Sequence, residues 1–266
     1  MSQVTWYFDV ISPYAYLAWH RLNRLPAGIE LRLQPILFAG LLNHWGQKGP
    51  AEVGPKRVWT YRSCLWQARQ DGVPFVMPAA HPFNSLPYLR LAIAAGNTRP
   101  AIDAIFKALW TRGADPADPA LLAELMDQLG VSADQLANPA LKAALRGATE
   151  LAIQRGVFGV PSLVINGEVF WGCDAIDFAA AYLVDPTVLV NDEMRRIENL
   201  PVGVARPGAG PVCRRPWLAP PRRSDAGPGQ AGRGGSSTRH PLVCPHSQPV
   251  TRGLTWPGTA SLAATA

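Results

Sequence analysis

The chain has 266 residues, of which 48% are hydrophobic and 17% are charged. This composition is typical of a globular protein long enough to bury a sizeable core, and it excludes a wholly disordered chain. The formal net charge of +6 belongs to one end: residues 1–204 carry 17 Lys and Arg against 18 Asp and Glu, whereas residues 205–266 carry eight Arg and one acid. The first 204 residues therefore favour neither a nucleic-acid nor a membrane partner.

The sequence contains no segment typical of secretion, membrane insertion or metal binding. It opens as a strand, without a basic stretch followed by an apolar one, and no run approaches the roughly 18 apolar residues of a membrane span. Its cysteines have no spacing typical of a metal site, and they are Cys64, Cys173, Cys213 and Cys244. We therefore expect a reduced, cytoplasmic protein that binds no metal.

A β-α-β unit is expected at the N-terminus. An apolar strand at 4–8 is followed by Ser12, a residue type that caps helices, and by Pro13, which favours the first helical position. The helix ends at 26–28, and residues 29–33 alternate as a second strand does. A right-handed crossover makes the two strands parallel neighbours.

The middle of the chain has helical rather than strand patterns. Residues 44–50 are rich in Gly and other residues common in loops, so a loop is expected there. Helical periods or caps follow at 56–70, 102–110, 121–129 and 139–156. These patterns predict an all-helical insertion at about 40–150 between the two halves of a sheet.

A β-hairpin is expected after this insertion. Two apolar runs, 162–165 and 168–171, flank Asn166-Gly167, the dipeptide typical of a type I′ turn. A last helix is expected after residues 172–174, with its N-terminus directed toward the functional site, where it favours a carboxylate. The expected fold class is therefore α/β.

The composition changes after about residue 200. Residues 205–266 contain 10 Pro, nine Gly and eight Arg without an apolar period. Such a segment buries too little apolar surface to offset its ordering entropy, so we predict a disordered tail at 201–266 beside one domain at 1–200. The tail is either an RNA- or partner-binding arm or an appendage without function, and we favour the appendage.

Several short motifs, taken in order, resemble those of a known family. They are Phe8-Asp9 with Ser12 to Ala18, Gly46 to Pro50, Pro78 to Asn84, Val157 to Ser162, and Phe170 to Asp174. Over roughly residues 4–200 the chain resembles the 2-hydroxychromene-2-carboxylate isomerases and the related kappa-class glutathione transferases. The resemblance implies a thioredoxin-like, DsbA-like fold in which Ser12-Pro13-Tyr14-Ala15 replaces the paired cysteines of a redox thioredoxin. It also implies glutathione as cofactor, a small-molecule substrate and a homodimer.

The resemblance further implies a glutathione site with Ser12 as the catalytic residue. Ser12 would hydrogen-bond the glutathione sulfur, Val160 before a cis Pro161 would pair with the cysteinyl unit, and residues 171–174 would hold the γ-glutamyl end. Gln47 stands where the transferases have an Asn that contacts the peptide. The full expected set is Ser12, Pro13, Tyr14, Gln47, Val160, Pro161, Trp171, Gly172, Cys173 and Asp174.

The key residues also have simpler structural interpretations. Ser12 at a helix N-terminus stabilises a thiolate, but it is equally a helix cap worth about 1 kcal/mol. A cis Pro161 presents the backbone of Val160 to a ligand, whereas a trans Pro161 only starts an edge strand. Asp174 either meets the ammonium of a γ-glutamyl group or caps the last helix. Together the motifs favour the functional interpretation of Ser12 and Pro161.

Contacts to the second substrate are expected in the loops that cover the site. His44, Lys48 and Asn84 are candidates, and His81 is a further candidate for moving a proton, with backbone hydrogen bonds as the alternative. Four aromatic residues either line a flat substrate or pack in the core, which is favoured for each: Trp45, Trp59, Trp66 and Tyr88.

The chain departs from the isomerases at the expected substrate contacts. A Lys and an Asn-Arg pair are expected there, and Leu42 and Glu52-Val53 occupy those positions. Compensation is expected from the nearby cations Lys48, Lys56 and Arg57. Glutathione use is therefore better supported than hydroxychromene carboxylate as the substrate.

The expected activity is isomerisation of an unsaturated cyclic carboxylate by reversible addition of glutathione thiolate. Addition turns a double bond into a rotatable single bond, ring opening and rotation follow, and expulsion of the thiolate restores the alkene as the other isomer. The alternatives are a kappa-like transferase that consumes glutathione and a non-catalytic thioredoxin-fold binding protein. Disulfide exchange is disfavoured because neither Cys64 nor Cys173 lies in the Ser12 to Ala15 quartet.

Overall fold

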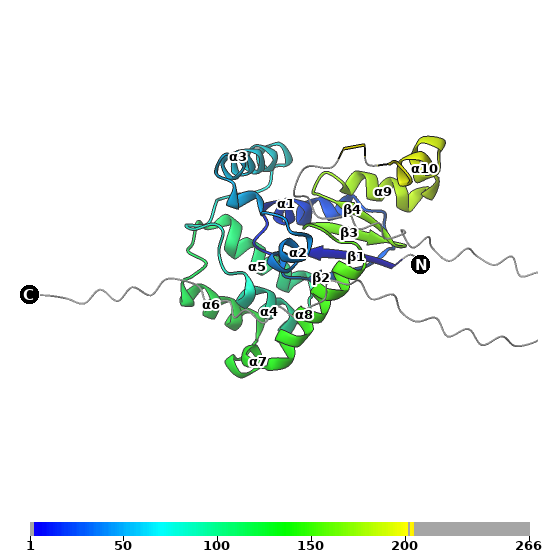
Figure 1. Ribbon diagram of the computed structural model, residues 1–266. Coiled ribbons are helices and arrows are strands. Elements are labelled where there is room, and N and C mark those ends of the chain that lie inside the picture. The colour runs from blue at the N-terminus through cyan, green and yellow to red at the C-terminus, as the bar shows by residue number, and fades with distance from the viewer. Residues whose placement is uncertain (1–2, 202, 205–266) are drawn as a thin grey trace, which may run out of the picture. The chain divides into compact units, whose positions relative to one another are not determined.

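The computed structural model of the protein describes residues 3–201 and 203–204. They form a four-stranded mixed sheet with helices on both faces (Figure 1). The strand order is β2-β1-β3-β4, with β1 at Gln3–Phe8, β2 at Glu30–Pro35, β3 at Ser162–Ile165 and β4 at Glu168–Trp171. The α/β architecture is confirmed. The expected disordered tail lies, apart from residues 201 and 203–204, outside the described residues.

The N-terminal β-α-β unit is formed as expected. β1 and β2 pair in parallel, with Phe8 opposite Pro35. Between them lie α1 (Pro13–Arg21) and the short 3-10 helix η1 (Leu22–Arg24). Ser12 is the N-cap of α1, and Pro13 at the first position lacks only an N–H that the helix does not use.

All described elements between β2 and β3 are helical, which confirms the helical insertion. They are α2 (Phe38–Trp45), η2 (Pro50–Glu52), α3 (Gly54–Asp71), α4 (Leu86–Ala94), α5 (Arg99–Thr111), α6 (Pro119–Leu129), α7 (Ala133–Ala137) and α8 (Pro139–Gln154). Gly130 ends α6 with a φ of 64°, and the Asn138 side chain caps α8.

The loop expected at 44–50 begins later than predicted. His44 and Trp45 form the last turn of α2, which ends at Gly46 with a φ of 62°. The indole Nε1 of Trp45 donates to the carbonyl oxygen of Val157 at 3.0 Å and so holds this turn against a distant segment. A local sequence pattern does not contain this tertiary contact, which explains the error.

The hairpin is confirmed in its expected form. Ser162 pairs with Trp171, and Asn166 and Gly167 have φ values of 53° and 94°, as a type I′ turn requires. Three helical elements follow, of which only the first was predicted: α9 (Ile176–Val184), η3 (Pro186–Leu189) and α10 (Asp192–Glu198). None of the helices in the described part of the chain has the length and apolar character needed to cross a membrane.

β1 is buried on both faces and joins two cores. Trp6 and Phe8 point into the larger core, where the ring of Phe106 in α5 lies 5.8 Å from that of Phe8. Tyr7 points into a smaller core with residues of α2 and α8, and its hydroxyl accepts a hydrogen bond from Arg155 at 2.9 Å. Burying each large apolar side chain stabilises the fold by about 1.5–3 kcal/mol, so β1 is a rigid base for the segment after it.

Candidate active site

Three segments leave the sheet at the same edge (Figure 1). β1 is antiparallel to β3, with Tyr7 opposite Ser162, so the end of β1 lies beside the start of β3. β4 ends at this edge as well, because Ser162 pairs with Trp171. Residues 9–12, 159–161 and 172–174 therefore come to one edge although they are far apart in the sequence.

Ser12 begins α1 in the first of these segments. The residue is 8% exposed, and its Oγ accepts the Ala15 N–H at 3.2 Å. This contact uses an acceptor lone pair, so the hydroxyl proton remains available to an incoming acceptor. Pro13 has no N–H, and the N–H of Tyr14 has no acceptor within the described chain. The positive end of α1 therefore offers two donors to an anion.

The Val160–Pro161 peptide bond is cis, as expected. Both residues are buried, and no residue of the described ranges pairs with the backbone N–H or C=O of Val160. Gly172 donates its N–H to the Pro161 carbonyl oxygen at 3.0 Å. The indole of Trp171 lies so close to Gly159 that a Cβ at Gly159 would overlap its Nε1. An unpaired stretch of backbone is thus held in a fixed position.

One arginine fixes the segment that follows β4. Arg21 of α1 donates from Nη1 to the Cys173 carbonyl oxygen at 3.1 Å and pairs with Asp71 of α3 at 2.7 Å. Gly172 has a φ of 111°, and a Cβ there would overlap the carboxylate of Asp174. The contacts to two helices set the shape of this segment and leave the Asp174 carboxylate exposed.

Tyr14 and two cysteines form a largely buried group beside the start of α1. Burial, with a contribution from Cys64, raises the pKa of the Tyr14 hydroxyl. Burial also raises the pKa of Cys64 to about 12 and that of Cys173 to about 11. Both cysteines are therefore thiols at neutral pH, whereas the thiolate is the nucleophilic form. Neither of them supplies a reactive sulfur to this site.

The expected contacts His44, Gln47 and Lys48 lie at the end of α2 and in the loop after it, where all three are exposed. Trp45 connects this region with residues 157–161 through its hydrogen bond to Val157. The ring of His44 meets the indole of Trp45 edge-on, with 4.9 Å between centroids. The end of α2, with His44, and the loop that holds Gln47 and Lys48 are thus attached to the segment 157–161.

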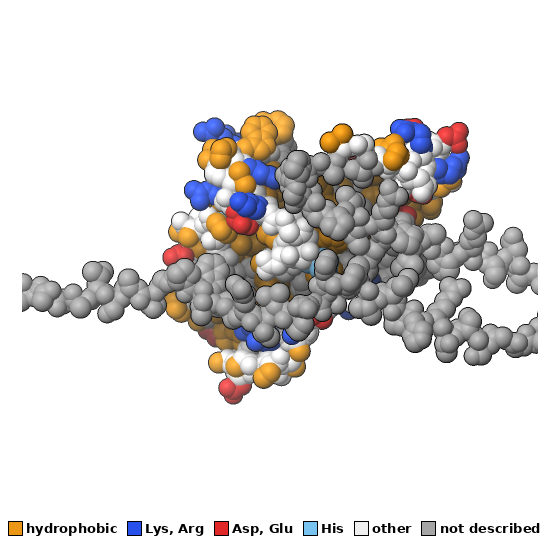
Figure 2. Space-filling view, in the orientation of Figure 1, with side chains coloured by type: hydrophobic (Ala, Val, Ile, Leu, Met, Phe, Trp, Pro, Cys, Tyr) orange, Lys and Arg blue, Asp and Glu red, His pale blue; other side chains and the backbone are white. Residues whose placement is uncertain are grey.

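The remaining candidates are distributed differently. Asn84 is exposed, and its Oδ1 accepts the Leu86 N–H at 3.2 Å at the start of α4. Tyr88 packs in the core, as favoured. Trp45, Trp59 and Trp66 are 36%, 68% and 63% exposed, so the core packing expected for them is wrong. The face of α3 that carries Trp59 and Trp66 is not covered by the described chain, and Figure 2 shows hydrophobic and cationic side chains gathered over this helix.

Two residues near the start of α1 have roles that sequence analysis missed or left open. Asp9 is 1% exposed, accepts the N–H groups of Ile11 and Phe38 at 3.1 and 2.9 Å, and has a pKa raised to about 6 by burial. His81 lies with Nε2 at 2.8 Å from the Ile11 carbonyl oxygen, which favours the backbone-binding alternative. An acidic residue directly after a strand was the sequence signal that could have indicated the role of Asp9. No sequence pattern indicated that Arg21 contacts the segment after β4.

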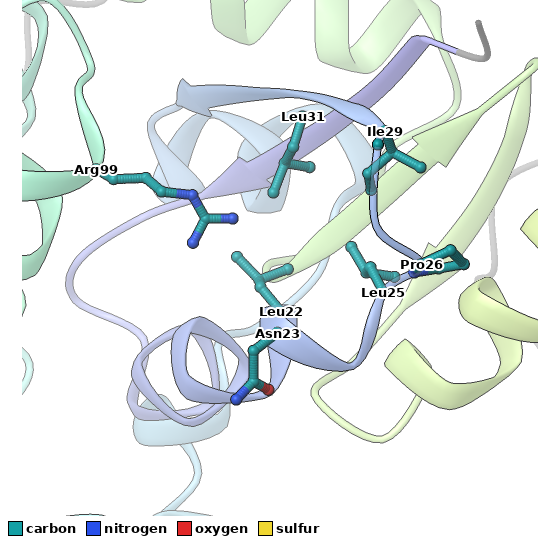
Figure 3. A pocket seen from close by; sticks show the side chains of 8 residues that line it. Leu22, Asn23, Leu25, Pro26, Ile29, Leu31 and Arg99 are labelled. Carbon is teal, nitrogen blue, oxygen red and sulfur yellow. The ribbon is translucent and has the colours of Figure 1, made fainter.

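A cavity of about 400 Å³ lies at the other end of α1 (Figure 3). It is lined by residues of η1, the following turn, β2 and the N-terminus of α5, where the guanidinium of Arg99 extends toward Leu22. None of the expected site residues lines it. In the described ranges, no three His, Cys, Asp or Glu side chains are grouped so as to hold a metal ion.

Comparison with known proteins identifies the same fold. Residues 3–184 match the DSBA-like thioredoxin domain. The 2-hydroxychromene-2-carboxylate isomerase of Sphingobium xenophagum is 32% identical over 192 residues, which cover 68% of this chain and 98% of that protein. Glutathione S-transferase kappa 1 of Homo sapiens is 26% identical over 200 residues, which cover 66% and 88%, respectively.

A solved structure of 2-hydroxychromene-2-carboxylate isomerase superposes with a TM-score of 0.59 at 25% identity. The superposition covers 71% of this chain and 99% of that one. The chain belongs to the DSBA-like thioredoxin domain family, and its relatives include 2-hydroxychromene-2-carboxylate isomerases and kappa-class glutathione transferases.

Proposed function

We propose that the protein is a glutathione-dependent isomerase that acts on an unsaturated cyclic carboxylate. The observation that carries the proposal is a serine hydroxyl, Ser12, at the N-terminus of α1, on the same sheet edge as the unpaired backbone of Val160. Because Cys64 and Cys173 are both held as thiols, such a site needs a sulfur from outside the described chain. The isomerase and transferase relatives support the same chemistry.

In this proposal glutathione lies along the sheet edge. Its cysteinyl unit pairs with the backbone of Val160 before Pro161, as an added strand pairs with a sheet. Its γ-glutamyl ammonium forms an ion pair with the exposed carboxylate of Asp174, in a binding site that residues 171–173 complete. Gln47, which is also exposed, is available to the rest of the peptide.

The same arrangement lowers the pKa of the bound thiol. The Ser12 hydroxyl and the Tyr14 N–H donate to the sulfur. The dipole of α1, which begins at Pro13, favours a negative charge on a sulfur beside this end of the helix. A hydrogen bond to a charged group contributes about 1.5–3 kcal/mol, which favours the thiolate over the thiol by roughly tenfold or more. Ser12 therefore stabilises the nucleophile and does not itself attack.

The proposed reaction returns glutathione unchanged. The ring first opens: its C–O bond breaks, the ring oxygen takes the electron pair and the proton of the hemiketal hydroxyl, and the hemiketal carbon becomes a ketone conjugated with the alkene. The sulfur lone pair then forms a C–S bond at one alkene carbon, while the π electrons move onto the conjugated carbonyl as an enolate. The former double bond then rotates as a single bond. The enolate electrons re-form the C=C bond and expel the thiolate, so no atom or electron is gained or lost.

A carboxylate substrate requires a cation near the thiolate. Arg57 of α3 is exposed, and its positive charge contributes to the lowered pKa of His81. The Nε2 of His81 contacts the carbonyl oxygen of Ile11, the residue before Ser12. We assign Arg57 and Lys48 to the substrate carboxylate, in compensation for the altered positions 42, 52 and 53. His44 and Asn84 are the candidates for other polar groups of the substrate.

A kappa-like transferase is the second candidate, and the altered substrate contacts Leu42 and Glu52-Val53 favour it. A transferase consumes glutathione with a model electrophile, whereas an isomerase leaves its concentration unchanged. A non-catalytic binding protein of this fold shows no glutathione affinity. We also propose a cytoplasmic location, where a glutathione pool is present, and a homodimer, which light scattering measures.

The proposed role of Ser12 is tested by Ser12→Ala. We expect the turnover number to fall by about tenfold to a hundredfold, because one hydrogen bond to the thiolate is lost. The dissociation constant of glutathione should change little, because the contacts of Val160 and Asp174 remain. Steady-state kinetics and calorimetry measure the two quantities.

Ser132→Ala is the matched control. Ser132 caps α7 through an Oγ that accepts the Gln135 N–H at 3.2 Å, the same distance as between Ser12 Oγ and the Ala15 N–H. This variant loses an equivalent cap and should keep full turnover, while Ser12→Thr, which retains a hydroxyl, should recover part of it. Full turnover by Ser12→Ala would overturn the proposed role.

A further inference from the structure

The peptide groups of Ile11, directly before Ser12, are held from both sides. The Ile11 N–H donates to Asp9 Oδ1 at 3.1 Å, and Nε2 of His81 lies 2.8 Å from the Ile11 carbonyl oxygen. The Ser12 N–H donates in turn to the Asp9 carbonyl oxygen at 3.0 Å. The short connection from β1 to α1 is therefore fixed by hydrogen bonds within it and by the contact of His81, as is typical of a preorganised site.

The Asp9 carboxylate also anchors this connection to other elements. Its Oδ2 accepts the N–H of Phe38, the first residue of α2, at 2.9 Å. The hydroxyl of Ser85, directly before α4, further stabilises the carboxylate. Asp9 and Ser85 are both buried. One buried carboxylate thus ties the start of α1 to the starts of two further helices.

His81 has one defined tautomer in this arrangement. A carbonyl oxygen only accepts, so Nε2 carries the proton that is donated to Ile11. Nδ1 lies 2.6 Å from the hydroxyl of Tyr61 and accepts from it. Burial, followed by the charge of Arg57, lowers the pKa of His81, in agreement with a neutral ring. The ring therefore connects α3 with Ile11 and has no free nitrogen for proton transfer.

We propose that Asp9 and His81 are positioning residues that clamp Ile11 and so hold the Ser12 hydroxyl against the sulfur of the bound thiol. This inference rests on the proposed function, because only a hydroxyl that donates to the sulfur gains from a fixed position. Hydrogen bonds weaken steeply with angle and distance, so a displacement of about 1 Å removes much of the benefit. Both side chains act through the backbone and do not touch the thiol.

Acid weakens the contacts of Asp9 and the contact between His81 and Tyr61, whereas the His81 N–H that donates to Ile11 is retained. A protonated Asp9 carboxyl donates from one oxygen and no longer accepts two N–H groups, and a protonated His81 no longer accepts from Tyr61. Because burial raises the pKa of Asp9 to about 6, its change falls near that pH. The groups that face this segment from the described elements are His81, Tyr61, Arg57, the Phe38 N–H and the Ser85 hydroxyl.

The His81 contact is tested by exchanging its donor. His81→Phe keeps a ring but has no N–H, so the turnover number should fall about tenfold while the dissociation constant of glutathione changes little. His81→Gln places an amide N–H near the position of Nε2 and should recover most of the loss. His20→Phe, at the other end of α1, is the control and should keep wild-type turnover. Unchanged turnover in His81→Phe, or no recovery in His81→Gln, would overturn this part of the proposal.

The Asp9 contact is tested by a pH profile. Asp9→Asn replaces one acceptor oxygen with a donor and does not titrate, so turnover at neutral pH should fall about tenfold. The part of the wild-type decrease in kcat/KM that has a midpoint near pH 6 should be absent from this variant, in which only the titration of the glutathione thiol still lowers the rate in acid. Asp103→Asn is the control, because that carboxylate accepts from Trp19 at 3.1 Å, and its profile should match the wild type. An acid limb with the same midpoint in Asp9→Asn and in the wild type would contradict the clamp.

Amide hydrogen exchange separates this inference from the proposed function. Exchange at Ile11 and Ser12 should accelerate in Asp9→Asn and in His81→Phe, with or without glutathione. If the wild type binds no glutathione, the proposed function fails, while this measurement still tests the clamp. If glutathione binds and turnover occurs but exchange at both amides is unchanged in both variants, the clamp fails and the proposed function stands.

Discussion

Asp9 is a buried carboxyl group whose ionised form is unfavourable in the folded state. Burial raises its pKa from 3.8 to about 6, so the folded protein holds this proton more tightly than the unfolded chain does. The resulting stabilisation is fully present below about pH 4 and is lost as the pH rises to about 6. At neutral pH the residue therefore lowers the stability of the fold, which is a common property of residues that serve a functional site.

The difference in unfolding free energy between the wild type and Asp9→Asn should therefore depend on pH. We expect it to shift against the wild type by about 3 kcal/mol between about pH 4 and about pH 7. The contributions of all other titrating groups cancel in this difference. Denaturant titrations of both proteins across this range measure it, and a difference that is constant with pH would contradict the raised pKa of Asp9.

The sequence predicts residues whose signals are local. Ser12 with Pro13 indicates a capped helix start, and the cis Val160–Pro161 bond follows from a resemblance carried by neighbouring residues. The partners of Asp9 and His81 come from distant parts of the chain, namely Phe38 for the first and Ile11 for the second. Such contacts exist only after folding, so no local pattern predicts them.

At the scale of elements, α1, α3 and the segment after β4 meet at Arg21. Its guanidinium donates to the Cys173 carbonyl oxygen and, at 3.1 Å, to Gln67 Oε1, and it forms an ion pair with Asp71. Both side chains of the pair are largely buried. Removal of one partner from such a pair leaves the other charge without compensation. Arg21 therefore links the stability of the fold to the shape of residues 172–174.

Arg21→Met should affect both properties. We expect the unfolding free energy to fall by roughly 2–4 kcal/mol, with Arg24, 3.6 Å from Asp71, retaining part of the interaction. Glutathione should bind more weakly, because the Cys173 carbonyl loses its donor. Arg146→Met, which breaks an exposed pair with Glu150, is the control and should change neither quantity. Equal effects of the two variants would contradict the linking role of Arg21.

Elements with strong periodicity are predicted well. The apolar stripe of α5, the Gly130 end of α6 and the Asn166-Gly167 turn are all found as expected. The last turn of α2 is not predicted, because it depends on the hydrogen bond of Trp45 to Val157. The exposed face of α3 is not predicted either, because its exposure depends on how the neighbouring elements pack. η3 and α10 are short, and their patterns are correspondingly weak.

At the scale of the whole molecule, the β-α-β and hairpin signals, together with the family resemblance, suffice to predict the sheet and its helical insertion. The packing of the insertion is not predictable in the same way, because it depends on contacts such as that of Phe106 with Phe8. The expected glutathione residues all lie between Ser12 and Asp174, and the family match ends at residue 184.

A chain truncated after Val204 should therefore bind glutathione as the full chain does. We expect the two dissociation constants to agree within about twofold, because the truncated chain keeps every residue expected to contact glutathione. Calorimetry on both proteins at equal ionic strength measures this. A clear loss of affinity in the truncated chain would assign a role in binding to residues 205–266.

The ionisation of the glutathione thiol in its complex with the protein tests the central claim most directly. Thiolate absorbance in the ultraviolet, followed against pH at saturating glutathione, reports the pKa of the bound thiol. The account predicts a pKa below that of free glutathione in the wild type and a return toward the free value in Ser12→Ala. Absence of binding, or a bound thiol that titrates like free glutathione in the wild-type protein, would contradict it.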